Sequence, residues 1–144
     1  MTTVATVDEF TTAWEGFFRA TRRARARSTL EGLSVAQYQL LERLRGAEAL
    51  TVSELAVSAG VAPPTATRML DVLVREGIAE RRAAEHDRRA VLVSLTPAGR
   101  EALEVAAASV AAARARVRDS LSPAEQEQAA KLLRRLAAIV EEQV

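Results

Sequence analysis

Hydrophobic and polar positions along the chain repeat with the spacing of helices more often than with that of strands. Near the start, Phe10, Trp14, Phe17 and Thr21 recur every three or four residues, with Phe18 beside them. This spacing predicts a helix over residues 7–27 with an aromatic stripe along one face. Such a stripe packs in a core or at a subunit interface, or it lines a ligand pocket. Packing and ligand binding are compatible roles for the same residues.

Polar residues at fixed spacing predict where the next two helices begin. Ser34 with Gln37, and Thr51 with Glu54, match the capping box, in which each of the two side chains satisfies a free backbone N–H group. The second of these helices is short, because Gly60 interrupts it. Glycine takes a positive φ without strain, so a tight turn is predicted there.

The residues after this turn predict a helix with one polar side. Pro63 fits its first turn, where the missing N–H of proline would have no partner, and Gly77 ends it. The predicted buried stripe consists of Ala66, Met69, Leu70 and Leu73. The other faces carry Pro64, Thr65, Thr67, Arg68, Asp71 and Arg75. Several polar residues therefore lie near the N-terminal end of this helix.

Two strand-like runs follow, over residues 78–83 and 90–95, and the second is rich in residues of high β-propensity. Between them lies a polar tip that contains Asp87, Arg88 and Arg89. Two short helices joined by a glycine turn and followed by such a hairpin form a winged helix-turn-helix. The predicted fold class is therefore mainly α with a small β-hairpin wing.

This arrangement indicates DNA binding. The second helix of the pair is sized for a major groove, and recognition helices contact base edges with residues near their N-terminus. The positive end of the helix dipole and free N–H groups at that end also favour a phosphate. An arginine-tipped hairpin is suited to an adjacent minor groove, where a narrow A·T-rich stretch attracts guanidinium groups.

Two more helices are predicted at the end of the chain. Thr96 is the expected N-cap of the first, in which Leu103, Val110 and Val117 recur every seven residues. A further capping box begins the second at Ser122. The helices that flank the winged helix-turn-helix cannot all bury their apolar faces in so small a monomer, which predicts a homodimer.

The chain is thus expected to have three parts. Residues 1–32 form an N-terminal dimerisation helix, residues 33–96 the winged helix-turn-helix DNA-binding domain, and residues 97–144 the C-terminal dimerisation helices. A two-fold dimer places two recognition helices roughly 34 Å apart, which is one turn of DNA, and so predicts a palindromic site on double-stranded DNA.

The composition excludes several classes of function. The chain has no cysteine, which excludes disulfides, thiol-based redox sensing and cysteine nucleophiles. His86 is the single histidine, so a zinc site would depend on carboxylates, and no metal or other cofactor is expected. The sequence shows no nucleophile–base pair and no phosphate-cradling glycine loop. The chain is therefore not expected to be an enzyme.

Charge and hydropathy add to this picture. The net charge of +1 is uninformative, because the distribution of basic residues matters more than their total. The arginines from Arg19 to Arg27 have no acid among them, which indicates a solvated face or pairing with acids of a partner helix. No apolar stretch approaches the roughly 20 residues that span a bilayer. Asp8 and Glu9 lie near the start of the chain, so a secretory signal is not expected. A cytoplasmic location without membrane contact is expected instead.

An ordered string of motifs extends from Thr51 to Arg100. It comprises Leu55-Ala56, Gly60-Val61, Pro63-Pro64-Thr65, Thr67-Arg68-Met69-Leu70, Leu73-Val74-Arg75-Glu76-Gly77, Asp87-Arg88-Arg89 and Val91-Leu92-Val93-Ser94-Leu95-Thr96-Pro97-Ala98-Gly99-Arg100. In this order the motifs resemble the helix-turn-helix and wing of the MarR family of bacterial regulators, and the resemblance covers nearly the whole chain. Ala62 departs from it, because the family often has a capping residue there, and a lost cap costs roughly 1 kcal/mol.

The resemblance implies an obligate homodimer with interlocked terminal helices. It also implies a recognition helix from Pro63 to Glu76 in the major groove and a wing in the minor groove. Arg89 is then the wing residue that enters the groove, and Asp87 orients the wing through salt bridges to nearby arginines. Such proteins are commonly repressors that small phenolic or other lipophilic anions release from DNA.

These arguments yield two sets of candidate site residues. The expected DNA-binding residues are Ser53, Pro63, Pro64, Thr65, Thr67, Arg68, Arg75, Arg82, Asp87, Arg88 and Arg89. The candidate residues for binding a small-molecule effector are Trp14, Phe17, Phe18 and Tyr38, for each of which core packing is the alternative. Arg68 is expected to contact a guanine or a phosphate, with a salt bridge to Asp71 as the alternative. Of Arg81 and Arg82, one is expected to reach a phosphate and the other to be structural.

The leading hypothesis is therefore a sequence-specific DNA-binding transcriptional regulator. It is expected to be a repressor that a small aromatic or lipophilic ligand releases from a palindromic operator. The alternative is a dimeric scaffold whose winged helix binds a protein. Arg68 and the run Asp87-Arg88-Arg89 argue against a scaffold, which has no need of arginines placed to reach DNA grooves.

Overall fold

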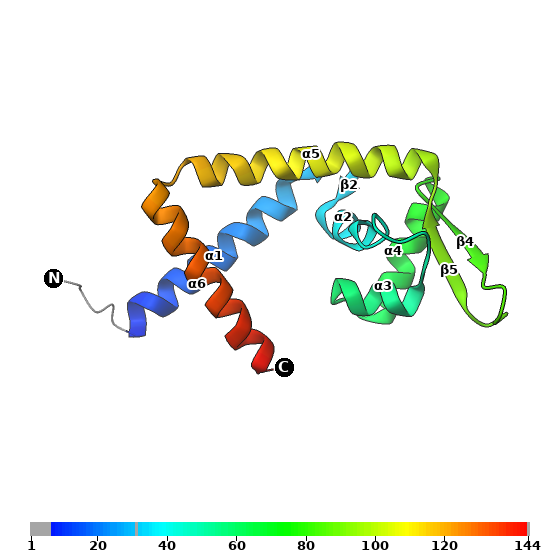
Figure 1. The fold of residues 1–144 in the computed structure, drawn as a ribbon, viewed down its shortest axis with the longest axis horizontal. Helices are drawn as coiled ribbons and strands as arrows, with labels where there is room; N and C mark the ends of the chain where they lie inside the picture. Colours follow the sequence, from blue (N-terminus) through cyan, green and yellow to red (C-terminus); the bar gives the residue numbers. More distant parts are fainter. Residues whose placement is uncertain (1–6, 31, 144) are drawn as a thin grey trace. The chain divides into compact units, whose positions relative to one another are not determined.

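The computed structural model describes residues 7–30 and 32–143, apart from the side chains of Val7 and Thr29 (Figure 1). The elements in chain order are α1 (Val7–Arg27), β1 (Thr29–Leu30), β2 (Leu33–Ser34), α2 (Val35–Glu42), β3 (Leu50–Thr51), α3 (Val52–Ala59), α4 (Pro63–Arg75), β4 (Ala79–Ala83), β5 (Val91–Leu95), α5 (Pro97–Asp119) and α6 (Pro123–Glu142). The described residues form two compact units, whose boundary falls within α5 between Ala106 and Ala107. The predicted mainly helical fold with a winged helix-turn-helix is confirmed.

The first unit has an aliphatic core between its helices and its sheet. The largest fully buried side chains are Leu40 and Leu41 of α2, Leu55 of α3, Leu70 and Leu73 of α4, Val93 of β5 and Leu103 of α5. Leu103 places the start of α5 in the same core as the helix-turn-helix. The helices α2, α3 and α5 and the strand β5 therefore pack with α4 around one core.

The two helices of the helix-turn-helix begin and end where the sequence predicts. Thr51 Oγ1 accepts the Glu54 N–H at 3.1 Å, and Glu54 Oε2 accepts the Thr51 N–H at 2.8 Å, which completes the capping box of α3. Gly60 ends α3 with φ +65°, and Gly77 follows the end of α4 with φ +74°. Both angles lie in the left-handed region that glycine adopts without strain.

The sheet has one strand more than the sequence analysis predicts. The strands β3, β5 and β4 pair antiparallel in that order, with Leu50 opposite Val93 and Ala79 opposite Leu95. Figure 1 shows the hairpin of β4 and β5. The expected hairpin is therefore correct, but it rests on a short third strand that runs directly into α3. A second pair, β1 with β2, was also not predicted and leads into α2. The strand β4 pairs on one side only and forms an edge of its sheet.

A close backbone contact joins the end of α4, the sheet and the start of α5. Thr96 Oγ1 accepts the Gly99 N–H at 3.0 Å and donates to the Gly77 carbonyl at 2.6 Å. The Thr96 N–H donates to the Ile78 carbonyl at 3.1 Å. A Cβ atom added to the buried Gly99 would collide with that same carbonyl oxygen. Only glycine fits at this point of α5.

The second unit contains the rest of α5 and α6. Ser122 and Glu125 form the predicted capping box, and the hydrogen bonds from Ser122 lower the pKa of Glu125 below its ordinary value. None of the residues of α6 is buried, and Leu132, Leu133, Ile139 and Val140 are exposed. The expected seam of α5 is buried at Leu103 but 69 % exposed at Val117. Among the described residues, no helix combines the length and the apolar character of a membrane span.

Replacing Gly99 with alanine is expected to destabilise the first unit. The added methyl group meets the Ile78 carbonyl, so α5 or the turn before β4 must shift, at a cost of about 1–3 kcal/mol. Urea denaturation followed by circular dichroism measures the change as a lower midpoint. Gly46→Ala is the matched control, because a Cβ at Gly46 meets no atom within 4 Å. Equal midpoints for the two variants would contradict the close contact.

Candidate nucleic-acid interface

The exposed side of α4 carries most of the predicted recognition residues. Pro63, Pro64, Thr65, Thr67 and Arg68 are all exposed, whereas Ala66, Leu70 and Leu73 of the same helix are buried. The burial pattern of the predicted stripe is thus confirmed, with Met69 only partly covered. The N-terminal half of α4 therefore presents a polar surface that is supported from behind by the core.

The N-terminus of α4 differs from the expectation in its hydrogen bonds. Ala62 provides no side-chain cap, but the first two helical residues are prolines and have no N–H group. The next two N–H groups, those of Thr65 and Ala66, both donate to the Ala62 carbonyl, at 2.9 and 3.0 Å. The absent cap therefore leaves neither of these two N–H groups without an acceptor, so they are not the free donors for a phosphate that the sequence predicts. The helix dipole remains as the attraction for an anion.

The polar side chains of α4 are partly held by the helix itself. Thr67 Oγ1 donates to the Pro63 carbonyl at 3.0 Å, and Arg68 Nε approaches the Pro64 carbonyl at 3.5 Å. The alternative in which Arg68 pairs with Asp71 is wrong, because Asp71 is bound to Arg81 at 2.6 Å. Within the described residues Arg68 has no carboxylate at salt-bridge distance, so its guanidinium group is exposed on the surface of α4.

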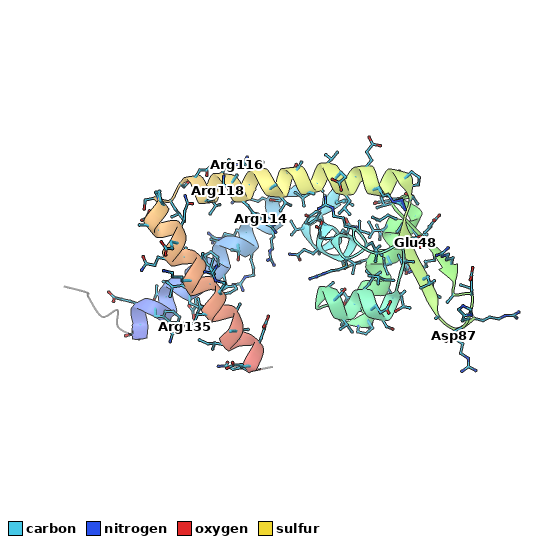
Figure 2. The ribbon with its side chains drawn as sticks, viewed as in Figure 1. Glu48, Asp87, Arg114, Arg116, Arg118 and Arg135 are labelled. Atoms are coloured by element: carbon cyan, nitrogen blue, oxygen red, sulfur yellow. The ribbon has the colours of Figure 1, made fainter. Side chains whose placement is uncertain are left out.

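The tip of the wing is shaped by Asp87. Its Oδ1 accepts the backbone N–H of Arg89 at 2.9 Å, and its carbonyl accepts the Ala90 N–H at 3.1 Å. The salt bridges to nearby arginines that the family resemblance implies are absent from the described residues; Asp87 orders the turn through the backbone instead. Figure 2 shows Asp87 at the end of the β4–β5 hairpin. Arg88 and Arg89 beside it are exposed.

The two arginines at the base of the wing have different surroundings. Arg81 binds Asp71 and its side chain is 29 % exposed, whereas Arg82 is exposed and forms no ion pair among the described residues. One of the two arginines is expected from the sequence to be structural, and in the structure that one is Arg81. Neither Arg81 nor Asp71 is among the predicted site residues. Strand alternation was the available signal, since Arg81 lies two residues after the buried Ala79.

Ser53 and Arg75 lie apart from the N-terminal half of α4. Ser53 is exposed in the first turn of α3, and Arg75 is exposed in the last turn of α4. The rise of a helix places Arg75 about 15 Å along the axis from Thr65. The predicted DNA-binding residues therefore form an extended surface and do not gather at one point.

Three of the four candidate effector-binding residues form an aromatic cluster on α1. The ring centres of Trp14 and Phe18 are 4.8 Å apart, and those of Phe17 and Phe18 are 5.6 Å apart. An open, shallow cavity of about 360 Å³ along one side of α1 is lined by Trp14, Glu15, Phe18, Arg19 and Arg22, all of this one helix. Tyr38 is buried in α2 and does not line this cavity. The structure thus groups Trp14, Phe17 and Phe18 but not Tyr38.

A second cavity, of about 490 Å³, lies between the end of α2 and the start of α5. Its floor includes the buried Leu44 and Leu103, and its rim carries Arg45, Glu48, Arg100 and Glu104. Arg45 bridges Glu42 at 3.1 Å and Glu104 at 2.9 Å, which raises the pKa of its guanidinium group. Figure 2 labels Glu48 beside the sheet. Within the described part of the chain, no three carboxylates or histidines group as metal ligands.

Comparison with known proteins gives a consistent result. The profile of the MarR family matches residues 33–91. The uncharacterized HTH-type transcriptional regulator YhbI of Bacillus subtilis is 34 % identical over 79 residues, which are 55 % of this chain and 51 % of YhbI. The chain thus spans about half the length of that relative.

Two solved structures are similar over almost the whole chain. A MarR family transcription regulator has a TM-score of 0.83 at 25 % identity, with 94 % of this chain and 93 % of the other covered. A mutant MarR from E. coli complexed with operator DNA has a TM-score of 0.73 at 25 % identity, covering 92 % and 99 %. The relatives are transcriptional regulators, which are not enzymes, and this confirms the expectation of a non-enzymatic protein.

Removing the Asp87 carboxylate is expected to loosen the wing tip. In Asp87→Ala the Arg89 N–H loses its acceptor, and a hydrogen bond worth about 1 kcal/mol corresponds to about fivefold faster amide exchange. Asp87→Asn is the control, because its side chain keeps an oxygen at the same place. Hydrogen exchange of residues 88–90 measures the effect, and identical exchange in the alanine and asparagine variants would contradict this role.

Proposed function

Because this chain belongs to the MarR family, we propose that it is a sequence-specific DNA-binding regulator of transcription. The observation that carries the proposal is the combination of an exposed polar half of α4 with a wing tipped by two exposed arginines on the same compact unit. A solved relative with this fold is complexed with operator DNA. A regulator that binds operator DNA acts in the cytoplasm of a bacterial cell.

In this proposal α4 lies in the major groove and the wing in an adjacent minor groove. Thr65, Thr67 and Arg68 face base edges or phosphates, with Pro63 and Pro64 at the groove entry. Arg88 and Arg89 reach into the minor groove from a tip that Asp87 shapes. Ser53, Arg75 and Arg82 contact the phosphate backbone, which positions the protein without reading sequence.

We further propose that the active form is a homodimer. Phe10 and Phe17 of α1 are 56 % and 57 % exposed, and Leu133 of α6 is 57 % exposed. Such side chains on long helices are expected to be covered in a functional assembly. Residues 1–32 and 97–144 then serve dimerisation, and residues 33–96 bind DNA. Two-fold symmetry would give a palindromic operator.

The effector proposal concerns the aromatic cluster of α1. Trp14 and Phe18 offer ring faces in the cavity lining, and Phe17 packs against Phe18 outside it. Arg19 and Arg22 in the same lining offer two positive charges against the single negative charge of Glu15. This combination suits a small aromatic anion, whose binding would release a repressor from its operator. Tyr38 contributes only if it leaves its buried position in α2.

Selection from a random pool of duplex DNA with the purified full chain tests the function directly. The expected outcome is a palindrome whose half-sites are about one turn apart, at a stated salt concentration, since phosphate contacts make the affinity salt-dependent. No enrichment by a folded dimer would contradict DNA binding and favour the protein-binding scaffold.

Arg89→Ala is expected to weaken binding to the selected operator about tenfold or more while the oligomeric state stays unchanged. One good guanidinium contact in a groove is worth about 1–3 kcal/mol. Fluorescence anisotropy over a series of salt concentrations measures the affinity for the operator. It also gives the slope of the logarithm of the binding constant against the logarithm of the salt concentration. Arg43→Ala removes an exposed arginine at the end of α2, outside the proposed DNA-binding and dimerisation residues, and is the control. An operator affinity equal to that of the control would contradict the wing assignment.

A further inference from the structure

Arg81 joins the wing to the proposed recognition helix. Its Nη1 donates to Asp71 Oδ1 at 2.6 Å, and its Nη2 approaches the Thr67 carbonyl at 3.4 Å. Thr67 and Asp71 are four residues apart and therefore lie one above the other on the same face of α4. The planar guanidinium group thus spans one turn of the helix, a geometry that the single ammonium group of lysine does not reproduce.

The wing has little other support on the side of α4. The strand β3 pairs only with Leu92 and Val93 of β5, so the hairpin beyond these residues has two strands. A two-stranded hairpin alone is at best marginally stable in water. In the described part of the chain, no other side-chain hydrogen bond connects β4 or the tip with α4. The orientation of the wing therefore depends on the packing at its base and on Arg81.

A small rotation at this point is amplified at the tip. The strand rises about 3.3 Å per residue, so the tip begins about 10 Å beyond Arg81. A rotation of about 10° would shift it by about 2 Å over that length. Binding residues must be held to within about 0.5 Å of their productive positions. A link at the base of the wing is thus sufficient to decide whether Arg88 and Arg89 meet the groove.

We propose that Arg81 is a positioning residue, which sets the angle between the wing and α4 by bridging Asp71 and the Thr67 carbonyl, and that it does not itself contact DNA. This inference rests on the proposed DNA-binding function. It assigns a role to two residues of opposite charge at the centre of the interface. Asp71 is required for DNA binding although its carboxylate repels phosphate.

The sign of the effect of Asp71→Asn separates this proposal from its alternative. If Arg81 were a phosphate contact, removing the negative charge would free its guanidinium group and strengthen binding. If Arg81 positions the wing, the same substitution loosens the bridge and weakens specific binding. Glu76→Gln is the matched control, because Glu76 follows α4, is exposed and forms no ion pair among the described residues.

The experiment measures the affinity of the full chain for the DNA that the wild type selects. We expect Asp71→Asn to weaken binding about tenfold and Glu76→Gln to leave it unchanged or slightly tighter. In an Arg89→Ala background the Asp71→Asn effect should be smaller than in the wild type, because one of the two misplaced arginines is already absent. Hydrogen exchange without DNA should be faster over residues 82–91 in Asp71→Asn only.

Each outcome bears on the proposal. Unchanged or tighter binding by Asp71→Asn, or an undiminished effect in the Arg89→Ala background, overturns the positioning role and leaves the proposed function standing. Unchanged exchange over residues 82–91 likewise overturns it without any use of DNA. A wild-type chain that selects no DNA overturns the proposed function itself.

Discussion

The contact between Gly99 and the Ile78 carbonyl is the constraint on which the rest of the DNA-binding unit depends. The turn between α4 and β4 lies so close to the first turn of α5 here that no space remains for a methyl group. Thr96 binds the same turn through its backbone N–H and its hydroxyl group. Because α4 precedes this junction and the wing follows it, backbone atoms hold the base of the wing against the end of α4, and the proposed bridge of Arg81 acts on the hairpin beyond that base.

Features that depend on neighbours within four residues could be predicted from the sequence. The capping boxes at Ser34, Thr51 and Ser122 form as expected, and Gly60 and Gly77 adopt the left-handed backbone that ends their helices. The buried stripe of α4 also follows directly from helical periodicity. These signals are local, so the sequence contains all the information that they require.

Features that depend on distant partners could not be predicted in this way. The strand β3 has two residues, and it is a strand only because Leu92 and Val93 of β5 lie beside it. Asp71 has Arg68 nearby on its own helix, yet it binds Arg81, ten residues away, because α4 lies against β4. For Ala62, comparison with the family indicated a missing cap. Of the two donors that a cap would serve, however, Pro64 has no N–H and the Thr65 N–H donates to the Ala62 carbonyl.

The position of β4 at the edge of its sheet has a consequence for solubility. An edge strand exposes unpaired N–H and C=O groups to which a strand of another molecule can add, which is a common route to aggregation. In β4 the exposed positions are Glu80, Arg81, Arg82 and Ala83, and the charged side chains at three of them oppose such pairing. The charges at the base of the wing thus also keep copies of the protein from joining edge to edge at high concentration. An apolar redesign of this strand would sacrifice that protection.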